Sequence, residues 1–490
     1  MKLDQLIYRN ELTSEENLGI FEIESVTTKP NEITNSSLFI FLRSEFFNVE
    51  GIADYVIAKS PLVILADNEL NISSDRIKIL RCNNTRNLLP FIYSRFYGIN
   101  YDRLKFCAVT GTNGKTTTAT MIHRILRKSS MNAGFIGTGK ILINEEKITD
   151  ENYSMTTPDP DILYKSIKRM EDAECKIIVM EVSSHALYYN KVSPIDFDVS
   201  IFTNLSPEHL DFHKDMDEYF RTKLKLFSKT KCGIFNLDDG YGRLAYEAMV
   251  GKKISFATTS TADVTAYKID EISLSKTKFK YHGDGKKIDV KLKLGGRYNA
   301  CNAALAICAA KLLGIDESLA CKAIEEIEYI DGRLEIIKDK ITVIIDYAHT
   351  HTALENVLKT IISYKNAEQR LFTVFGCGGN RDRYKRPKMA AVAEKYSDFV
   401  IVTADNSRSE PLENIIADIL QGFKSTEKRI VITSRSAAIE HAILSAKDGD
   451  LIAIIGKGHE RYNIDENGYS SFDERDIVKK AITKRSGDKL

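Results

Sequence analysis

CAVTGTNGKTTTAT, residues 107–120, decides the fold of this chain. The stretch is an apolar run that breaks into a Gly-rich turn, TGTNGKTT, and then continues with helical periodicity. A strand, a glycine turn and a helix N-terminus in this order place backbone N–H groups around a phosphate. Val109 stands where the general phosphate-loop spacing has its first glycine, but the surrounding pattern still predicts a nucleotide site.

Short apolar runs alternate with helical-period segments along the rest of the chain. They cover residues 37–42, 61–66, 176–182, 341–348, 370–376, 398–404 and 450–456. This alternation is typical of buried parallel strands joined by crossover helices, so we predict an α/β protein. Between residues 252 and 295 apolar and polar residues alternate instead, which predicts a β-meander inside the middle unit.

The chain has 490 residues, too many for one ordinary hydrophobic core. We predict three domains, residues 1–100, 101–330 and 331–490. The first boundary precedes the strand that leads into the Gly-rich turn. The second falls near EYIDGRLEII, where a helical segment gives way to a glycine turn and a new series of strands.

Composition narrows the class of protein. The 69 basic and 68 acidic residues leave a net charge of +1, which gives no reason to expect nucleic acid or an anionic membrane as a partner. The first twenty residues carry scattered charges and no apolar core segment, so we expect a cytoplasmic protein. The eight cysteines include no C-x-x-C pair and are predicted to be reduced core thiols.

Acidic and histidine residues follow the predicted strands after the Gly-rich turn. Lys115 would reach the β- and γ-phosphates, and Thr116 with Glu181 could offer oxygen ligands to Mg²⁺. Glu181 directly follows an apolar run, at the strand end where α/β folds bind ligands. Taken singly, Glu181 is better explained as a cap or salt bridge and His209 as an ordinary histidine. Their joint position downstream of a phosphate turn favours a metal-assisted phosphoryl site.

An ordered set of motifs resembles the Mur ligases. It comprises TGTNGKTT (110–117), MTTPD (155–159), MEVSSHAL (180–187), FTNLSPEHLDFH (202–213), YFRTKLKLF (219–227), GGRYNACNAALA (295–306), DGRLE (331–335), DYAHT (346–350), GCGGNRDRYKRP (376–387), TADNSRSEP (403–411) and GKGHE (456–460). The sequence is most similar to the members that add the third amino acid of the cell-wall peptide. The match spans roughly residues 90 to 470.

The resemblance implies a fold and a reaction. It implies an N-terminal UDP-binding α/β domain, a central phosphate-loop ATPase domain with a mostly parallel sheet, and a C-terminal Rossmann-like domain that holds the amino acid. ATP would phosphorylate a carboxylate of UDP-MurNAc-L-Ala-D-Glu, and an incoming amine would attack the acyl phosphate to give an amide, ADP and phosphate. The step belongs to peptidoglycan precursor synthesis, which determines cell shape and accompanies division. We expect a monomer.

The resemblance also implies roles at the ATP site. Lys115, Glu181, His209 and Lys223 match catalytic positions. Thr116, Glu181 and His209 match ligands of two Mg²⁺ ions, and Lys223 matches a lysine that reacts with carbon dioxide to become a carbamate. Lys225 is the alternative candidate for the carbamate, and both lysines would otherwise be read as solvated. Further nucleotide contacts are implied at Gly111, Thr112, Asn113, Gly114, Thr117, Asn299, Asn302, Arg333 and Asp346.

The two other substrates are assigned by the same resemblance. Thr156, Thr157 and Ser184 match contacts to the sugar-peptide. The diamino-acid pocket is implied at Arg381, Asp405, Asn406, Ser407, Arg408, Gly456 and Glu460. Arg408 would grip the distal carboxylate of meso-diaminopimelate, because a planar guanidinium binds a carboxylate through two hydrogen bonds. Meso-lanthionine would satisfy the same arginine, and L-lysine would not.

The sequence departs from the family pattern at three places. Ser407 replaces the usual proline of the recognition loop, and His351-Thr352 replaces Pro-Asp. The N-terminal signature is reduced to KPNEITNSSLFIF (29–41), so no uridine contact is assigned. The competing readings are an L-lysine-adding relative, a folylpolyglutamate synthetase and, from another class, a phosphate-loop NTPase switch.

Overall fold

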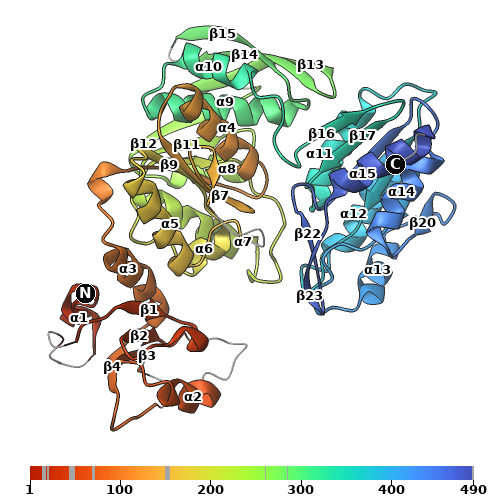
Figure 1. Ribbon diagram of the computed structural model, residues 1–490. Helices are drawn as coiled ribbons and strands as arrows, with labels where there is room; N and C mark the ends of the chain where they lie inside the picture. Colours follow the sequence, from red (N-terminus) through yellow and green to blue (C-terminus); the bar gives the residue numbers. More distant parts are fainter. Residues whose placement is uncertain are drawn as a thin grey trace.

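The computed structural model describes residues 1–13, 18, 21–42, 50–68, 72–148, 155–259, 261–283 and 285–487. These residues form three successive α/β bodies, each built on its own sheet (Figure 1). The strands of these sheets fall within the three predicted domain ranges, while the boundaries at residues 100 and 330 stay a prediction.

The N-terminal body contains a four-stranded parallel sheet in the order β1-β2-β3-β4. Its strands are β1 (Ser25–Thr27), β2 (Ser37–Ile40), β3 (Val63–Asp67) and β4 (Lys78–Cys82). Its helices are α1 (Leu3–Leu6), α2 (Ala53–Ala58) and α3 (Thr85–Tyr97). The Asn84 side chain caps the start of α3, and Gly98, with φ of 62°, ends it. The helix then leads directly into the central body (Figure 1).

The central body is built on an eleven-stranded sheet in the order β15-β14-β13-β12-β11-β10-β5-β9-β6-β7-β8. Its strands are β5 (Lys105–Thr110), β6 (Ala133–Gly137), β7 (Lys140–Ile143), β8 (Glu146–Lys147), β9 (Ile177–Glu181), β10 (Phe197–Phe202), β11 (Thr230–Asn236), β12 (Lys252–Ala257), β13 (Val264–Ser273), β14 (Lys276–Gly283) and β15 (Lys286–Leu292). The strand before the Gly-rich turn, β5, lies between β9 and β10 and parallel to both. The carboxyl ends of β5, β9 and β10 therefore meet at one edge of the sheet.

Helices cover both faces of this sheet. They are α4 (Lys115–Lys128), α5 (Pro160–Asp172), α6 (Ser184–Tyr188), α7 (Met216–Leu224), α8 (Gly240–Ala248), α9 (Arg297–Leu312) and α10 (Glu317–Glu325). Helices α4, α9 and α10 share one apolar core, and α5, α7 and α8 share a second core that continues into the N-terminal body. This continuity joins the first two bodies.

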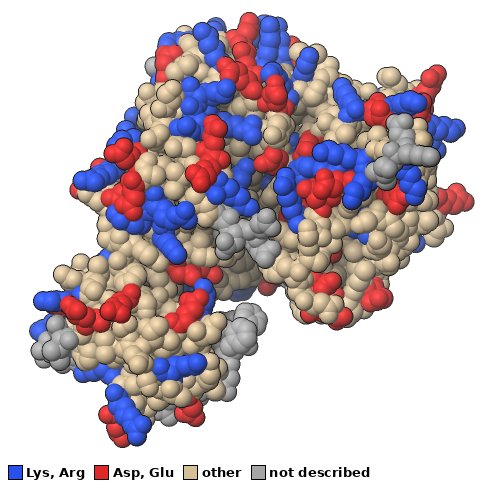
Figure 2. Space-filling view, viewed as in Figure 1, with Lys and Arg blue, Asp and Glu red and all other residues tan. Residues whose placement is uncertain are grey.

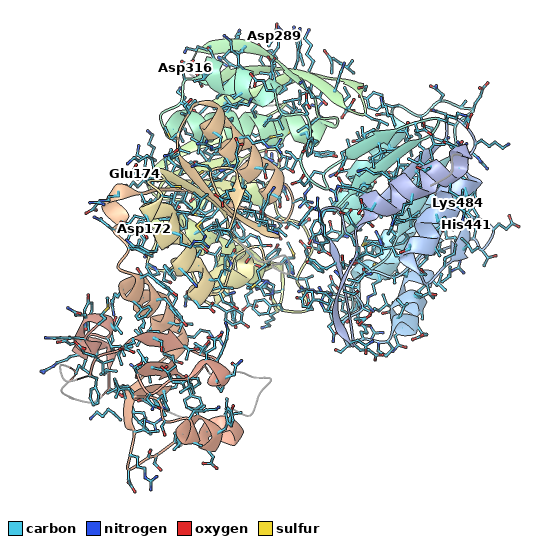
Figure 3. The ribbon with its side chains drawn as sticks, viewed as in Figure 1. Asp172, Glu174, Asp289, Asp316, His441 and Lys484 are labelled. Atoms are coloured by element: carbon cyan, nitrogen blue, oxygen red, sulfur yellow. The ribbon has the colours of Figure 1, made fainter. Side chains whose placement is uncertain are left out.

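The predicted meander begins later than residue 252. Strand β12 pairs parallel to β11, and only β13, β14 and β15 are antiparallel to one another. The outermost strands carry lysines and acids such as Asp289 at the exposed end of the body (Figure 3). Such charges discourage an edge strand from pairing with another chain.

The C-terminal body has a six-stranded sheet in the order β16-β17-β21-β18-β19-β20. Its strands are β16 (Glu335–Lys338), β17 (Thr342–Asp346), β18 (Leu371–Phe375), β19 (Phe399–Val402), β20 (Arg429–Val431) and β21 (Leu451–Ile455), with a hairpin of β22 (Tyr462–Asp465) and β23 (Gly468–Ser471). Its helices are α11 (His351–Ile362), α12 (Lys385–Tyr396), α13 (Leu412–Leu420), α14 (Arg435–Ser445) and α15 (Glu474–Ser486). Helices α11, α12 and α13 pack on one face, and α14 and α15 on the other.

A short connection joins the central and C-terminal bodies. At Gly332 φ is 62°, and a Cβ there would lie 2.2 Å from the backbone nitrogen of His459. The Gly332 carbonyl also accepts a hydrogen bond from the Tyr347 N–H at 2.9 Å. The connection is thus packed onto the C-terminal body, where only glycine fits.

Other sequence-level predictions are tested directly by the described residues. All eight cysteines are unpaired, and seven are buried. Within the described ranges, no helix combines the length and apolar character needed to cross a membrane.

Candidate functional site

The Gly-rich turn connects β5 to α4. Gly111 has φ of 142°, and a Cβ at this position would lie 2.0 Å from the Thr203 Oγ1 atom, so the turn requires glycine. The Lys115 ammonium donates hydrogen bonds to the carbonyls of Gly111 and Thr112, both at 2.9 Å. Burial lowers the pKa of Lys115, and the neighbouring Glu208 and Glu181 carboxylates oppose that shift. The lysine is therefore folded over its own turn.

Glu181 ends strand β9 beside this turn. Its fully buried carboxylate accepts hydrogen bonds from Thr116 Oγ1 at 2.8 Å, from the Thr138 N–H at 2.9 Å and from Thr138 Oγ1 at 3.2 Å. All three donors are neutral, so they orient the carboxylate without balancing its charge. This geometry suits a cation ligand better than the cap or salt bridge considered above.

Lys223 in α7 and Lys225, which directly follows that helix, have different surroundings. Lys223 is 1 % exposed, whereas Lys225 is exposed to solvent. The Lys223 Nζ atom lies 3.1 Å from the Gly111 carbonyl and 3.5 Å from Thr110 Oγ1. Burial, reinforced by the Lys115 ammonium, holds the pKa of Lys223 well below its usual value. An amine with a lowered pKa is nucleophilic, which favours Lys223 over Lys225 as the reactive lysine.

His209 lies in the loop after β10 with φ of 58°. Burial lowers the pKa of its imidazole to about 3, so the ring is neutral at physiological pH and can offer a lone pair. The adjacent Glu208 is buried and lies 2.8 Å from the Nε2 atom of His349, a residue of the C-terminal body. Burial alone would raise the pKa of Glu208, but His209 and His349 together hold it well below its usual value. This contact spans the two bodies.

A second contact between the bodies comes from the connecting segment. Arg333 Nη2 donates to Thr116 Oγ1 at 3.1 Å, and its guanidinium lies 4.6 Å from the centre of the Tyr347 ring. Asp346 accepts hydrogen bonds from the N–H groups of Leu334 and Ala348, and burial raises its pKa. Arg333 and Asp346 therefore adjoin the phosphate turn from the far side.

Two asparagines of α9 complete this side. The Asn302 Oδ1 atom accepts a hydrogen bond from Thr118 Oγ1 at 3.3 Å and lies against Gly114. Asn299 sits behind it and donates to the Gly295 carbonyl at 2.7 Å.

Three hydroxyl groups predicted to contact the sugar-peptide lie beside Glu181. Thr157 Oγ1 donates to the Glu181 carbonyl at 2.9 Å, and Thr156 Oγ1 lies 3.0 Å from Thr138 Oγ1. Ser184 is 2 % exposed, and its Oγ atom has no hydrogen-bond partner among the described residues. Ser184 therefore lines the cavity with a hydroxyl group that can accept or donate a hydrogen bond.

The C-terminal pocket is centred on Asn406, in the loop after β19. Its Oδ1 atom accepts hydrogen bonds from Lys457 Nζ at 2.7 Å and the Ile464 N–H at 3.0 Å, and its Nδ2 donates to Glu460 at 2.8 Å. Burial and the nearby Asp405 carboxylate raise the pKa of Glu460. Against the effect of its burial, the Lys457 ammonium keeps the pKa of Asp405 low.

Two arginines face this pocket from different loops. Arg408, with φ of 55°, donates from Nη1 to the carbonyls of Gly379 and Asn406 at 3.0 and 3.2 Å. Burial lowers the pKa of Arg408, and the positive charge of Arg381 adds to that effect. Two guanidiniums this close favour an anionic group between them.

One cavity of about 710 Å³ joins these features. Its walls contain every candidate site residue except Gly111, Asn299 and Ser407, which lie just behind them. Lys115, Lys223 and Glu181 line its central-body side, and Arg381 and Arg408 line its C-terminal side. Lys and Arg side chains follow the facing edges of the two bodies in Figure 2. The Gly-rich turn and the pocket with the two arginines thus open into the same space.

Family models agree with this arrangement. Residues 109–310 match the Mur ligase middle domain, and residues 332–458 match the Mur ligase glutamate ligase domain. The chain belongs to the Mur ligase family. Members of this family are ATP-dependent ligases, and the family resemblance inferred from the motifs is confirmed.

Individual relatives extend the match over nearly the whole length. The UDP-N-acetylmuramoyl-L-alanyl-D-glutamate–2,6-diaminopimelate ligase of Aquifex aeolicus is 36% identical over 464 residues, covering 94% of each chain. A solved ligase of the same name matches with a TM-score of 0.69 at 26% identity and 99% coverage of both chains. The MurF ligase of Thermotoga maritima, solved with ADP, matches with a TM-score of 0.62 at 16% identity, covering 94% of this chain and 97% of its own, which shows the fold alone.

Several residues of this Mur ligase site were not singled out from the sequence. They are Thr138, Glu208, His349 and Lys457. His349, Lys457 and Glu208 all lie inside the motifs quoted above, and Glu208 directly precedes His209. Their place in those motifs was the sequence feature that could have identified them. Thr138 follows a short strand and carries no comparable pattern. Thr352, at one of the departures from the family pattern, also lines the cavity.

The donor set can be compared with the needs of Mg²⁺. Among the described residues there is no group of three His, Cys, Asp or Glu side chains that could hold a metal alone. Mg²⁺ commonly takes one or two protein ligands together with water and substrate phosphates. Thr116 and Glu181 fit that pattern.

Proposed function

We propose that this Mur ligase joins an amino group of meso-diaminopimelate to the free carboxylate of UDP-MurNAc-L-Ala-D-Glu while ATP is converted to ADP and phosphate. The observation that carries the proposal is the shared cavity, in which Lys115 and Lys223 face Arg408 across one space. The names of the relatives give the same reaction. Meso-lanthionine, which also has two carboxylates, is the alternative substrate.

The central body would bind the nucleotide. The N–H groups at the start of α4 would bind the phosphates, and Lys115 would leave its carbonyl partners to contact them. Asn302, Arg333 and Asp346 would enclose the remainder of the nucleotide, with Asn299 holding Asn302 in place. Mg²⁺, when bound, would neutralise phosphate charge that otherwise repels the attacking carboxylate.

Thr116 and Glu181 would hold one Mg²⁺ and His209 a second. Lys223 would contribute as a carbamate: its neutral amine attacks carbon dioxide, one proton leaves, and an anionic group with two oxygens replaces the buried amine. A buried anion beside the phosphate turn is a better neighbour for a cation than an ammonium would be. The low pKa of Lys223 supports this step, because only the neutral amine reacts.

The acceptor carboxylate would lie between Ser184 and the phosphate turn. Ser184 Oγ has no partner in the described protein, and Thr156 and Thr157 lie beside it, so these hydroxyls would orient the sugar-peptide. The carboxylate attacks the γ-phosphorus and ADP leaves. The acyl phosphate then faces the C-terminal side of the cavity.

The diamino acid would enter from that side. Arg408, with Arg381, would bind the distal carboxylate, while Asp405 and Glu460 would bind the distal ammonium. Asn406, Ser407 and Gly456 would shape the walls. The proximal amine then attacks the acyl carbon and gives up a proton as the amide bond forms, while the acyl C–O bond breaks and phosphate leaves with its electron pair.

The alternatives are less well supported. An L-lysine-adding enzyme has no use for two guanidiniums in its amino-acid pocket, because lysine has no distal carboxylate. The full-length match to tripeptide-forming ligases does not favour a folylpolyglutamate synthetase or an NTPase switch. We expect the enzyme to act in the cytoplasm as a monomer.

Phosphate release tests the proposal. ATP, Mg²⁺ and UDP-MurNAc-L-Ala-D-Glu are supplied with meso-diaminopimelate, meso-lanthionine or L-lysine. Release that depends on a dicarboxylic amino acid supports the ligase and the role of Arg408. Preference for L-lysine would keep the ligase and overturn the role of Arg408, and release without any amino acid would count against the ligase itself.

A further inference from the structure

Arg386 is a buried cation that does not itself line the cavity. Its side chain is 0% exposed at the start of α12. Nη1 and Nη2 each donate to the Glu410 carboxylate at 2.7 Å, Nη1 also donates to Asp418 at 2.9 Å, and Nη2 to the Gly378 carbonyl at 3.2 Å. Burying a guanidinium costs about several kcal/mol unless well-placed partners offset the loss of water. The Glu410 and Asp418 carboxylates are such partners here.

These partners belong to the two loops that carry the pocket arginines. Gly378 lies in the loop after β18, which also carries Arg381, and Glu410 lies in the loop after β19, which also carries Arg408. Glu410 additionally accepts the N–H of Asn380 at 2.7 Å. Arg386 and Glu410 therefore join the two loops by four hydrogen bonds, although neither residue lines the cavity itself.

The loops are also in direct backbone contact. A Cβ on Gly379 would lie 1.9 Å from the Ser407 carbonyl and 3.0 Å from the Glu410 Cβ. The separation of the loops is thus fixed on the side away from the ligand. This matters because Arg381 and Arg408 repel each other, a repulsion that the nearby Asp405 and Glu460 carboxylates oppose.

We propose that Arg386 and Glu410 are positioning residues that hold Arg381 and Arg408 at the separation a distal carboxylate requires. This inference rests on the proposed function. It adds a specificity role for two residues that do not reach the cavity. Without the pair, the two guanidiniums would move apart in the free enzyme, and the diamino acid would have to bring them together as it binds.

Glu410→Gln tests the proposal, because it keeps the shape of the side chain and removes its charge. We expect the KM for meso-diaminopimelate to rise about tenfold, which corresponds to the loss of one charge-assisted hydrogen bond. The KM values for ATP and for the sugar-peptide should stay within about twofold, because the change is confined to two loops that these substrates are not expected to contact. Lys359→Ala is the matched control: Lys359 is exposed on the same body and pairs with Glu355, outside both loops.

Two results would overturn the proposal. One is an unchanged KM for meso-diaminopimelate in Glu410→Gln; the other is an equal rise in all three KM values, which marks a general structural loss. Arg386→Lys provides a second measurement, since one ammonium cannot replace both donors, and the same selective rise is expected. A wild-type enzyme that shows no amino-acid-dependent phosphate release would refute the proposed function instead, so the two failures are distinguishable.

Discussion

A buried ion pair supports the strand ends that carry the amino-acid pocket. Arg435 begins α14 and Glu474 begins α15, and their side chains are 2% and 0% exposed. Arg435 Nε donates to Glu474 at 2.7 Å, Nη2 to the Ile455 carbonyl at 2.9 Å and Nη1 to the Ala404 carbonyl at 3.2 Å. Ala404 and Ile455 directly precede Asp405 and Gly456 of the pocket.

Removing one partner should be costly. Arg435→Met leaves the Glu474 carboxylate buried without its cation, and the other carboxylate oxygen has no hydrogen-bond partner among the described residues. Breaking a buried pair in this way costs about 3–5 kcal/mol. For a domain of the size predicted for residues 331–490, each kcal/mol lowers Tm by about 2–4 °C, so a fall of roughly 6–20 °C is expected.

The double variant Arg435→Met/Glu474→Leu distinguishes pairing from packing. Replacing both charges by apolar side chains removes the uncompensated charge, so the double variant should be more stable than the sum of the two single changes implies, by about 2 kcal/mol or more. Differential scanning calorimetry of the full chain measures all three variants. The control is Lys484→Met, which removes a surface ion pair with Glu440 on the same body (Figure 3) and should cost less than about 1 kcal/mol.

Additivity would refute the reasoning. If the free energies of unfolding of the two single variants add to that of the double variant within about 0.5 kcal/mol, Arg435 and Glu474 are not coupled. A fall in Tm for Arg435→Met no larger than for Lys484→Met would show that the buried charge is tolerated and would likewise contradict the argument.

Three further predictions concern the cavity. Lys223→Ala should abolish phosphate release, and short carboxylic acids should restore part of it; full activity without added acid would exclude the carbamate. Gly111→Ala should weaken ATP binding at least tenfold in a calorimetric titration, because its Cβ would lie 2.0 Å from Thr203 Oγ1 at a φ of 142°. Because the pKa of Glu208 is lowered in the folded protein, its contact with His349 should be present at neutral pH and be lost as the pH falls through that lowered pKa. Small-angle scattering of Glu208→Gln at neutral pH should accordingly show a larger radius of gyration than the unchanged protein.

Local pattern was enough to predict much of the fold. The apolar runs at residues 176–182, 370–376 and 450–456 became β9, β18 and β21, because strands buried on both faces leave a continuous apolar signal. The start of the meander was wrong because alternation reports exposure of one face and not the direction of the neighbouring strand. Strand β12 lies within the predicted range and yet pairs parallel to β11.

Pattern was weaker where contacts join distant segments. Arg386 meets Glu410 and Arg435 meets Glu474 across 24 and 39 positions, and no periodicity in the sequence marks either pair. Motif order located the cavity walls well, since all but three of the candidate site residues line one cavity. The motif already favoured Lys223 over Lys225, and the structure adds a physical reason, because Lys223 is buried and Lys225 is exposed.

The packed turn at Gly332 would determine which part of the connecting segment moves if the central and C-terminal bodies separate. Because Gly332 lies against His459 and Tyr347, we expect Gly332 and Arg333 to stay with the C-terminal body in an opening motion, whereas Asp331 pairs with Lys140 of the central body. Arg333 would then be withdrawn from Thr116 by any opening motion, although both belong to the ATP site. ATP would then contact both bodies only in the closed enzyme. Bound ATP would therefore stabilise the closed arrangement, in which the amino-acid pocket lies next to the acceptor carboxylate.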